Sequence, residues 1–335
     1  MALLEVKNLR TTFDIHVGRV QAVRGIDFAI EAGETVGIVG ESGCGKSVSM
    51  MSILRLLPKY ASVECDRMMF DGIDLTRAND AALRAVEGDK IGMVFQDPMT
   101  SLNPLLTIGA QLAEPLRIHK KVSRREAGAR ALELLKTVDM PAPESRLRQY
   151  PHQLSGGQRQ RVMIAMAIAC GPKLVIADEP TTALDVTIQA QILDLMRDLQ
   201  RKMNTAVVLI THDLGVIAGM CKRVIVMYAG KIVEQGAVRE LFYGPRHPYT
   251  WGLLGSIPGT GGTAEAPGRL HSIPGTPPDL IAPPAGCPFA PRCRYAMNIC
   301  LTQEPPETRL SDSHGARCYL LDTGAPKVTW GGGGA

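Results

Sequence analysis

Three short apolar runs stand out in the pattern of hydrophobic and polar positions. They are "TVGIVG" at 35–40, "LVIA" at 174–177 and "AVVLI" at 206–210. β-Branched residues are frequent in all three, which is typical of a strand that is buried on both faces of a parallel sheet. The pattern therefore predicts three buried strands.

Helical periodicity marks two further segments. "VSMMSILRLL" at 48–57 follows the first predicted strand, and "RREAGARALELLKTVDM" occupies residues 124–140. In the second segment, helical spacing places five apolar residues on one face: Ala127, Ala131, Leu134, Leu135 and Val138. Between the two helices, "DPMTSLNP" at 97–104 is rich in proline and in Ser, Thr and Asn, so it predicts a loop.

Composition and charge exclude several classes of protein. The 335 residues are long enough for two domains, and a net charge of +4 with 4% aromatic residues is unlike a nucleic-acid-binding protein. The N-terminus alternates and carries charges early, so it is no secretory signal. The longest apolar run, "VMIAMAIAC" at 162–170, is far shorter than the roughly 18–20 residues needed to span a bilayer. The chain is therefore expected in the cytosol.

The strongest local motif directly follows the first predicted strand. It has the form G-x-x-x-x-G-K-S and consists of Gly40, Glu41, Ser42, Gly43, Cys44, Gly45, Lys46 and Ser47. A strand, a glycine loop and a helix in this order predict a P-loop, whose backbone N–H groups and helix N-terminus surround phosphate oxygens. We expect Lys46 to reach the β- and γ-phosphates and Ser47 to bind Mg²⁺. Cys44 is expected to be a small filler of the loop.

Two adjacent carboxylates, Asp178 and Glu179, end the second predicted strand. The two carboxylates of such a pair can have different roles. The first, Asp178, would bind Mg²⁺, and the second, Glu179, would polarise the attacking water as a general base. Combined with a P-loop, the pattern predicts a nucleotide-hydrolysing site.

A second anion-binding surface is predicted at "LSGGQRQRV", residues 154–162. Ser155, Gly156 and Gly157 lead into an apolar helix, whose N-terminus offers unpaired N–H groups and a hydroxyl. One chain already has one phosphate cradle. The surplus site is expected to serve a nucleotide held by another subunit.

Together these motifs resemble the ATPase subunits of ABC transporters, over about residues 3–245. The resemblance implies that ATP and Mg²⁺ are the cofactors and that Ser155, Gly156, Gly157 and Gln158 contact ATP as the signature motif. It also implies roles for residues elsewhere in the chain: Gln96 as the Q-loop residue at Mg²⁺, Asp185 in the D-loop, His212 as the switch histidine at the γ-phosphate, and Phe13 as the aromatic that stacks on adenine. Phe13 could instead be a core residue at a strand edge.

The resemblance also implies the fold class and the domains. The fold class is α/β: a P-loop ATPase domain with a RecA-like mixed sheet, an antiparallel β subdomain and a helical subdomain that carries the signature, followed by a cysteine-containing extension. We expect the nucleotide-binding domain at 1–245, with the helical subdomain at about 97–160. A region rich in Pro and Gly should follow at 246–286 as a linker, and the cysteine extension at 287–335.

Two stretches are similar to the peptide/nickel importer ATPases in particular: residues 150–193 and "RHPYTWGLLGSIPG" at 246–259. The tail is similar to that of dipeptide and oligopeptide permease ATPases. This resemblance implies import of peptides, at the cytoplasmic face of the cell membrane. The implied partners are two transmembrane permease subunits, a second ATPase subunit and an extracytoplasmic peptide-binding protein, with no nucleic acid.

Four other classes of ATPase are the alternatives. A chromosome-maintenance or repair ATPase would insert long heptad arms between P-loop and signature, and none is present in 48–153. A ribosome-acting ABC factor would carry two motif sets, and this chain has one. A nickel or other small-solute importer, or a soluble ATPase of iron–sulfur assembly, stays open, although the last would not need the tail.

Four of the eight cysteines lie in the last 49 residues: Cys287, Cys293, Cys300 and Cys318, spaced C-x₅-C-x₆-C-x₁₇-C. Because a cytosolic location disfavours disulfides, such a cluster predicts metal ligands that staple a segment with little core of its own. The spacing lacks the tight pairs that are common at zinc sites but does not exclude zinc. The resemblance to peptide-permease ATPases implies a 4Fe-4S cluster on these four thiolates.

Overall fold

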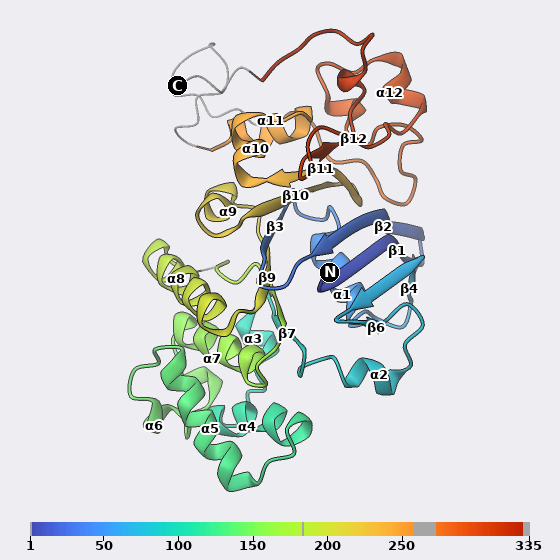
Figure 1. Ribbon diagram of the computed structural model, residues 1–335. Coiled ribbons are helices and arrows are strands. Elements are labelled where there is room, and N and C mark those ends of the chain that lie inside the picture. The colour runs from blue at the N-terminus through green and yellow to red at the C-terminus, as the bar shows by residue number, and fades with distance from the viewer. Residues whose placement is uncertain (1, 183, 258–272, 331–335) are drawn as a thin grey trace. The chain divides into compact units, whose positions relative to one another are not determined.

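The computed structural model describes residues 2–182, 184–257 and 273–330, and its chain forms two compact units (Figure 1). Unit 1 consists of residues 1–3, 30–35 and 71–210, and unit 2 of residues 4–29, 36–70 and 211–335. Both units mix strands and helices.

Unit 1 contains two of the predicted buried strands. β8 (Leu174–Asp178) pairs in parallel with β9 (Ala206–Ile210) on one side and with β7 (Ile91–Val94) on the other. Every residue of β8 and β9 is buried. The prediction of strands covered on both faces is confirmed here, because neither strand has a polar face to offer to water.

The segment 97–160 is largely helical, as predicted. It contains α3 (Pro98–Ser101), α4 (Ile108–His119), α5 (Arg124–Thr137), α6 (Pro143–Arg146), the 3₁₀ turn η1 (Pro151–Gln153) and the start of α7 (Gly156–Ile168). Figure 1 shows α4 to α7 side by side, and α4, α5 and α7 pack against one another. On α5 the predicted face is buried at Ala127, Ala131 and Leu135 and half-buried at Leu134.

The prediction of a plain loop at 97–104 is wrong in part. Residues 98–101 form α3, whose N-cap Asp97 accepts a hydrogen bond from the backbone N–H of Met99 at 2.8 Å. Asp followed by Pro is a favourable helix start, since the carboxylate caps a free N–H and Pro needs none at the first position. Unit 1 also contains β6 (Ile73–Asp74) and α2 (Asp80–Arg84).

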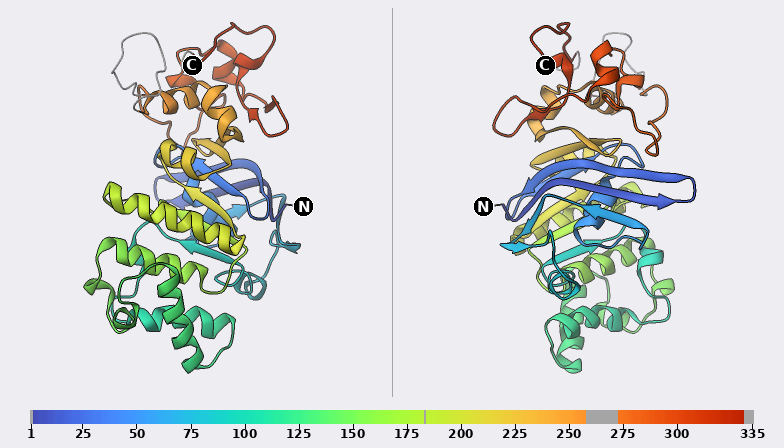
Figure 2. Two further views of the ribbon diagram at one scale, coloured as in Figure 1. Left: turned by 60° about the vertical axis from the view of Figure 1, so that its left-hand side comes forward. Right: turned by 90° about the vertical axis from the view of Figure 1, so that its right-hand side faces the viewer.

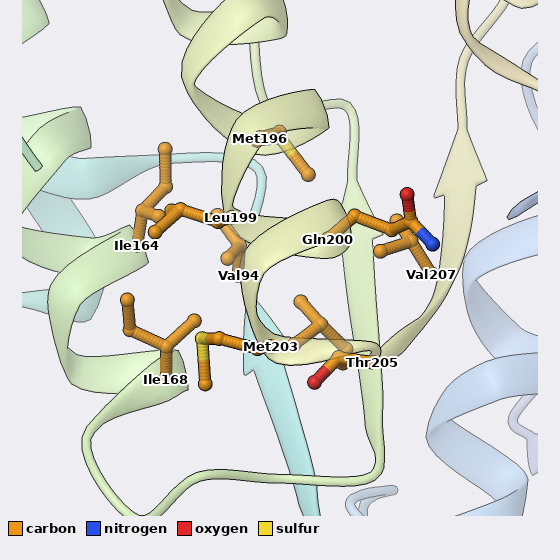
Figure 3. Close-up of a pocket in the computed structure, with 10 residues that line it drawn as sticks. Val94, Ile164, Ile168, Met196, Leu199, Gln200, Met203, Thr205 and Val207 are labelled. Atoms are coloured by element: carbon orange, nitrogen blue, oxygen red, sulfur yellow. The ribbon is translucent and has the colours of Figure 1, made fainter. Parts of the chain in front are cut away.

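The longest helix, α8 (Val186–Met203), buries one apolar stripe at Ile192, Leu195, Met196 and Leu199. A cavity of about 20 Å³ remains beneath it, between α8, α7 and the parallel strands. Figure 3 shows its mostly apolar lining. Its two polar neighbours already have partners, because Gln200 donates to the Gly33 carbonyl at 2.9 Å and Thr205 to the Pro172 carbonyl at 2.7 Å. The cavity is therefore a packing defect of the core.

Unit 2 contains an antiparallel sheet. Its strands are β1 (Leu4–Ile15), β2 (Gly18–Ile30), β4 (Ala61–Glu64) and β5 (Arg67–Phe70), with β1 between β2 and β5 and also paired with β4. The right-hand view of Figure 2 shows β1 and β2 as two long neighbouring strands. This sheet is the predicted antiparallel β subdomain.

The second set of strands in unit 2 begins with the strand of the P-loop. β3 (Thr35–Val39) pairs in parallel with β10 (Arg223–Tyr228), and β10 pairs antiparallel with β11 (Lys231–Ala237). Three helices accompany these strands: α1 (Lys46–Ile53), α9 (Leu214–Met220) and α10 (Val238–Tyr243). β3 is buried throughout, which confirms the third predicted strand.

The C-terminal tail continues this sheet. β13 (Gly315–Ala316) pairs with β11, and β12 (Thr308–Arg309) pairs with β13. The rest of the tail consists of short pieces: η2 (Ala290–Arg292), α12 (Asn298–Thr302) and η3 (Tyr319–Leu321). Strand pairing with β11 thus fastens the tail to the rest of unit 2.

The predicted linker 246–286 begins with a helix instead. α11 (Pro248–Gly255) buries Tyr249, Trp251 and Leu254, so the first part of this region is a packed helix. Three aromatic and aliphatic side chains in eight residues supply enough apolar area to hold a short helix against a core. Residues 273–286 contain neither helix nor strand. Residues 258–272 of the predicted linker lie outside the described part of the chain.

Candidate nucleotide site

The P-loop has the backbone that its glycines allow. Gly40, Gly43 and Gly45 have φ values of 153°, 77° and 101°, in a region that side chains disfavour. A Cβ on Gly40 would stand 2.2 Å from the Met227 carbonyl oxygen, and one on Gly45 would stand 2.4 Å from that of Ala22. The loop therefore requires glycine at both positions for conformation and for space.

Lys46 is buried at the first turn of α1, and its side chain folds back over the loop. Its Nζ donates to the carbonyl oxygens of Gly40 at 2.7 Å and of Glu41 at 2.9 Å. The P-loop backbone thus holds the positively charged ammonium group at the loop, where it can attract a negatively charged polyphosphate. Cys44 is buried beside it, and burial raises the pKa of its thiol, as expected of a filler rather than a nucleophile.

A contact with α11 was not predicted from the sequence. The hydroxyl oxygen of Tyr249 accepts a hydrogen bond from the backbone N–H of Glu41 at 2.8 Å. The Tyr249 ring is fully buried and stacks in a tilted geometry on Tyr228, with centroids 4.6 Å apart. An isolated tyrosine some 200 residues away offers no local signal, so only the fold brings it to the P-loop.

In unit 1, the two predicted carboxylates lie at the end of β8. Asp178 is buried, with 2% of its surface exposed, and Glu179 has a left-handed backbone with φ of 45°. A carboxylate oxygen of Glu179 accepts hydrogen bonds from Gln96 Nε2 at 3.3 Å and from Thr182 Oγ1 at 2.8 Å. The structure therefore brings Gln96 to the predicted base, and it adds Thr182, which the sequence alone did not indicate.

The signature residues begin α7 as predicted. The Ser155 hydroxyl accepts from the Gln158 N–H at 3.4 Å, and the Gln158 side chain accepts from the Ser155 N–H at 3.1 Å, which is a capping box. Ser155 and Gly156 are exposed. A Cβ on Gly157 would stand 2.7 Å from Ile188 Cγ2 of α8, so glycine lets the two helices approach.

Asp185 caps the neighbouring helix α8 by accepting from the Ile188 N–H at 2.9 Å. The signature and the predicted D-loop residue Asp185 thus lie at the N-terminal ends of α7 and α8, and these two helices are in contact.

His212 and Phe13 belong to unit 2. His212 is exposed in the turn between β9 and α9, and Asp213 after it caps α9. Phe13 is half-buried on β1, with its ring 6.1 Å from that of Tyr60 at a tilt of 57°. Their predicted contacts with γ-phosphate and adenine remain predictions.

The four tail cysteines line one cavity, together with apolar side chains such as Phe289 and Tyr319. Burial is the main cause that raises the pKa of Cys287 to about 11 and that of Cys318 to about 12, and each also feels neighbouring cysteines. Cys287 N–H donates to the Cys300 carbonyl at 2.8 Å. Over the described ranges, however, the side chains include no group of three or more His, Cys, Asp or Glu that is placed to hold a metal ion.

As far as the chain is described, no helix combines the length and the apolar character that crossing a membrane requires.

Comparison with known families gives two matches. The family described as ABC transporter matches residues 23–182, and the family described as oligopeptide/dipeptide transporter, C-terminal region, matches residues 233–300. The chain is 55% identical over 329 residues to the oligopeptide transport ATP-binding protein OppD of Bacillus subtilis, covering 97% of this chain and 91% of OppD. It is 53% identical over 331 residues to the dipeptide transport ATP-binding protein DppD of the same organism, covering 98% of both.

Solved structures give the same result for the fold. A dimeric structure of MJ0796, described as a bacterial ABC transporter cassette, has a TM-score of 0.62 at 33% identity and covers 70% of this chain and 99% of that chain. A second dimeric structure of MJ0796, in a post-hydrolysis state with ADP and phosphate, has a TM-score of 0.61 at 34% identity over the same shares. The fold class predicted from the sequence is confirmed.

Proposed function

Because the chain belongs to the family of ATP-binding proteins of oligopeptide and dipeptide ABC transporters, we propose that it hydrolyses ATP to drive peptide import. The contact between Gln96 and Glu179 carries the catalytic part of the proposal. It joins the residue expected to bind Mg²⁺ to the carboxylate expected to act on water, 83 positions apart in the sequence.

Each residue has a proposed role in hydrolysis. Glu179, oriented by Gln96 and Thr182, accepts the proton of the attacking water. Lys46 and the P-loop N–H groups hold the β- and γ-phosphates, His212 contacts the γ-phosphate and Phe13 stacks on adenine. Bound Mg²⁺ would neutralise developing phosphate charge, and Ser47, Asp178 and Gln96 are its proposed ligands. The buried position of Asp178 and the oxygen chemistry of all three side chains suit that ion.

We propose that the signature serves the nucleotide of a second ATPase subunit. Ser155 and Gly156 are exposed at the start of a 13-residue helix, where N–H groups and the helix dipole favour an anion. The similarity to dimeric cassettes supports pairing of two such chains. Asp185 lies at the start of the adjacent helix α8 and would line the same interface between the two ATPase subunits.

Peptide is the proposed cargo because both named relatives transport peptides and align over nearly the whole chain. The proposed partners are two transmembrane permease subunits, a second ATPase subunit and an extracytoplasmic peptide-binding protein, with the chain peripheral on the cytoplasmic face of the membrane. A nickel or other small-solute importer is the alternative. Purified complex in proteoliposomes, with binding protein and labelled peptide outside and ATP inside, tests the proposal. ATP-dependent uptake of dipeptide and not of nickel supports peptide import, and the reverse would overturn it.

We propose further that Cys287, Cys293, Cys300 and Cys318 hold a 4Fe-4S cluster. The support is the chemistry of the donors, because four thiols line one cavity with an otherwise mainly apolar wall, although in the described part of the chain they are not grouped as metal ligands. His247 also lines it, but burial lowers its pKa to about 4, so it adds no positive charge at neutral pH. Anaerobically purified protein should be brown, and the Cys293→Ser variant should lose this colour. Colourless protein that contains one equivalent of zinc would contradict the cluster and show that the cysteines bind zinc.

A further inference from the structure

An arginine of the cysteine tail is paired with a P-loop residue. The guanidinium of Arg292 donates to both carboxylate oxygens of Glu41, from Nη1 at 2.6 Å and from Nη2 at 3.0 Å. The Arg292 side chain is 5% exposed and that of Glu41 is 27% exposed. A two-pronged pair at this burial is the strong kind of ion pair, unlike the solvated pairs elsewhere on the surface.

The remaining donors of Arg292 are also committed. Nε donates to the Pro274 carbonyl at 2.8 Å, Nη2 to the Ile273 carbonyl at 3.2 Å and Nη1 to the Tyr228 hydroxyl at 3.1 Å. The guanidinium also lies over the Tyr228 ring, 5.7 Å from its centroid. A planar fork fixed on several sides holds its carboxylate in one place, which a flexible ammonium would not do.

The same stretch of tail supports the aromatic wall behind the P-loop. The Phe289 ring lies 5.2 Å from Tyr228 and 5.4 Å from Tyr249, and Tyr249 accepts the hydrogen bond from the Glu41 N–H. Both the backbone and the side chain of Glu41 are therefore held by residues outside the P-loop. Arg292 is also the direct neighbour of Cys293, which lines the cysteine cavity.

A carboxylate inside a phosphate-binding loop needs a counter-charge. Glu41 is the second residue of the loop, and its charge has the same sign as a polyphosphate. Like charges that share a site disfavour each other, and an adjacent guanidinium removes that cost. We propose that Arg292 is a positioning residue for ATP: from the C-terminal tail it neutralises and fixes the Glu41 carboxylate and so sets the affinity of the P-loop for ATP. This inference rests on the proposed ATP-binding role of residues 40–47.

The test measures ATP affinity by equilibrium binding on the full chain, and KM and kcat in ATPase assays. Arg292→Ala leaves an uncompensated carboxylate and should raise the Kd and KM for ATP about tenfold, with a smaller change in kcat. Adding Glu41→Gln to that variant removes the charge and should bring Kd back to within about threefold of wild type. Arg292→Lys keeps a cation without the fork and should fall between wild type and Arg292→Ala. Arg294→Ala, an exposed arginine two residues away, should match wild type.

These variants distinguish neutralisation of the Glu41 carboxylate by Arg292 from a purely structural role in which Arg292 only holds the tail. If Arg292 only held the tail, the double variant would bind ATP as weakly as Arg292→Ala or more weakly, and that result would overturn the inference. Unchanged Kd in Arg292→Ala would overturn it as well, while circular dichroism confirms that each variant is folded. A wild-type chain that binds no ATP would instead overturn the proposed function itself.

Discussion

The buried carboxylate of Glu234 on β11 should decide whether the tail stays docked. One of its oxygens accepts from the Arg246 N–H at 2.7 Å and lies 2.8 Å from His314 Nε2, while the other accepts from the His247 N–H at 3.0 Å. The Glu234 side chain has 0% exposure and that of His314 has 6%. His314 directly precedes β13, so this carboxylate fastens the tail to the sheet.

The loss of stability expected in Glu234→Gln follows from the number of hydrogen-bond acceptors that the carboxylate provides. In Glu234→Gln an amide NH₂ replaces one oxygen, so a buried N–H donor faces another donor and the remaining bonds lose their charge. One unsatisfied buried donor together with weakened charged hydrogen bonds should cost about 2–4 kcal/mol. Glu307→Gln is the matched control, because Glu307 belongs to the same tail but pairs with Gln235 and Arg317 at a partly exposed site. That change should cost below about 0.5 kcal/mol.

Native-state hydrogen exchange measures the opening of the tail. The Arg317 N–H donates to the Val233 carbonyl at 2.8 Å, so its exchange reports separation of the tail from β11. We expect exchange at Arg317 to become roughly thirtyfold faster or more in Glu234→Gln, since about 1.4 kcal/mol corresponds to tenfold. Equal exchange rates in the Glu234→Gln and Glu307→Gln variants would show that the Glu234 carboxylate does not hold the tail on β11.

Two further predictions concern the remaining parts of the chain. Ser155→Arg should leave ATP affinity of the isolated chain unchanged while ATPase activity of the assembled complex collapses, because a bulky cation blocks the surface offered to the partner; lost affinity in the monomer would place Ser155 in its own site. Val207→Ile adds one methylene at the cavity under α8 and should raise the free energy of unfolding by about 0.5–1 kcal/mol in urea titrations, and a loss of stability would mean that the cavity cannot accept it.

The fold could be predicted where the sequence carries a local pattern. β3, β8 and β9 follow from short apolar runs rich in β-branched residues, and the P-loop follows from glycines at positions whose φ values side chains disfavour. The short helix α3 was missed because a single cap at Asp97, rather than any periodicity, decides it. β13 has two residues, too few to show alternation, so its pairing with β11 has no sequence signal.

The residues of the nucleotide site also fall into those with a local sequence signal and those without one. Motif residues such as Lys46 and Glu179 are identified by their neighbours in the sequence. Contacts between distant segments are not, because Arg292 reaches Glu41 across 251 positions and in the sequence each residue has only the local pattern of an ordinary surface charge. Thr182 has no signal in the sequence for a different reason, since a threonine near an acidic strand is common and only the orientation of its hydroxyl makes it a partner of Glu179.

The role of Glu179 as general base is best measured in the Glu179→Gln variant of the assembled complex, assayed for ATP binding and for steady-state hydrolysis together. The amide keeps the shape of the side chain but cannot take a proton from water, and general base catalysis is worth about 10²–10⁴-fold. We expect ATP bound at wild-type affinity, hydrolysis reduced by at least about a hundredfold and accumulation of an ATP-bound closed pair of subunits. Hydrolysis near the wild-type rate would contradict the assignment of Glu179 as the base and, with it, the mechanism proposed for this chain.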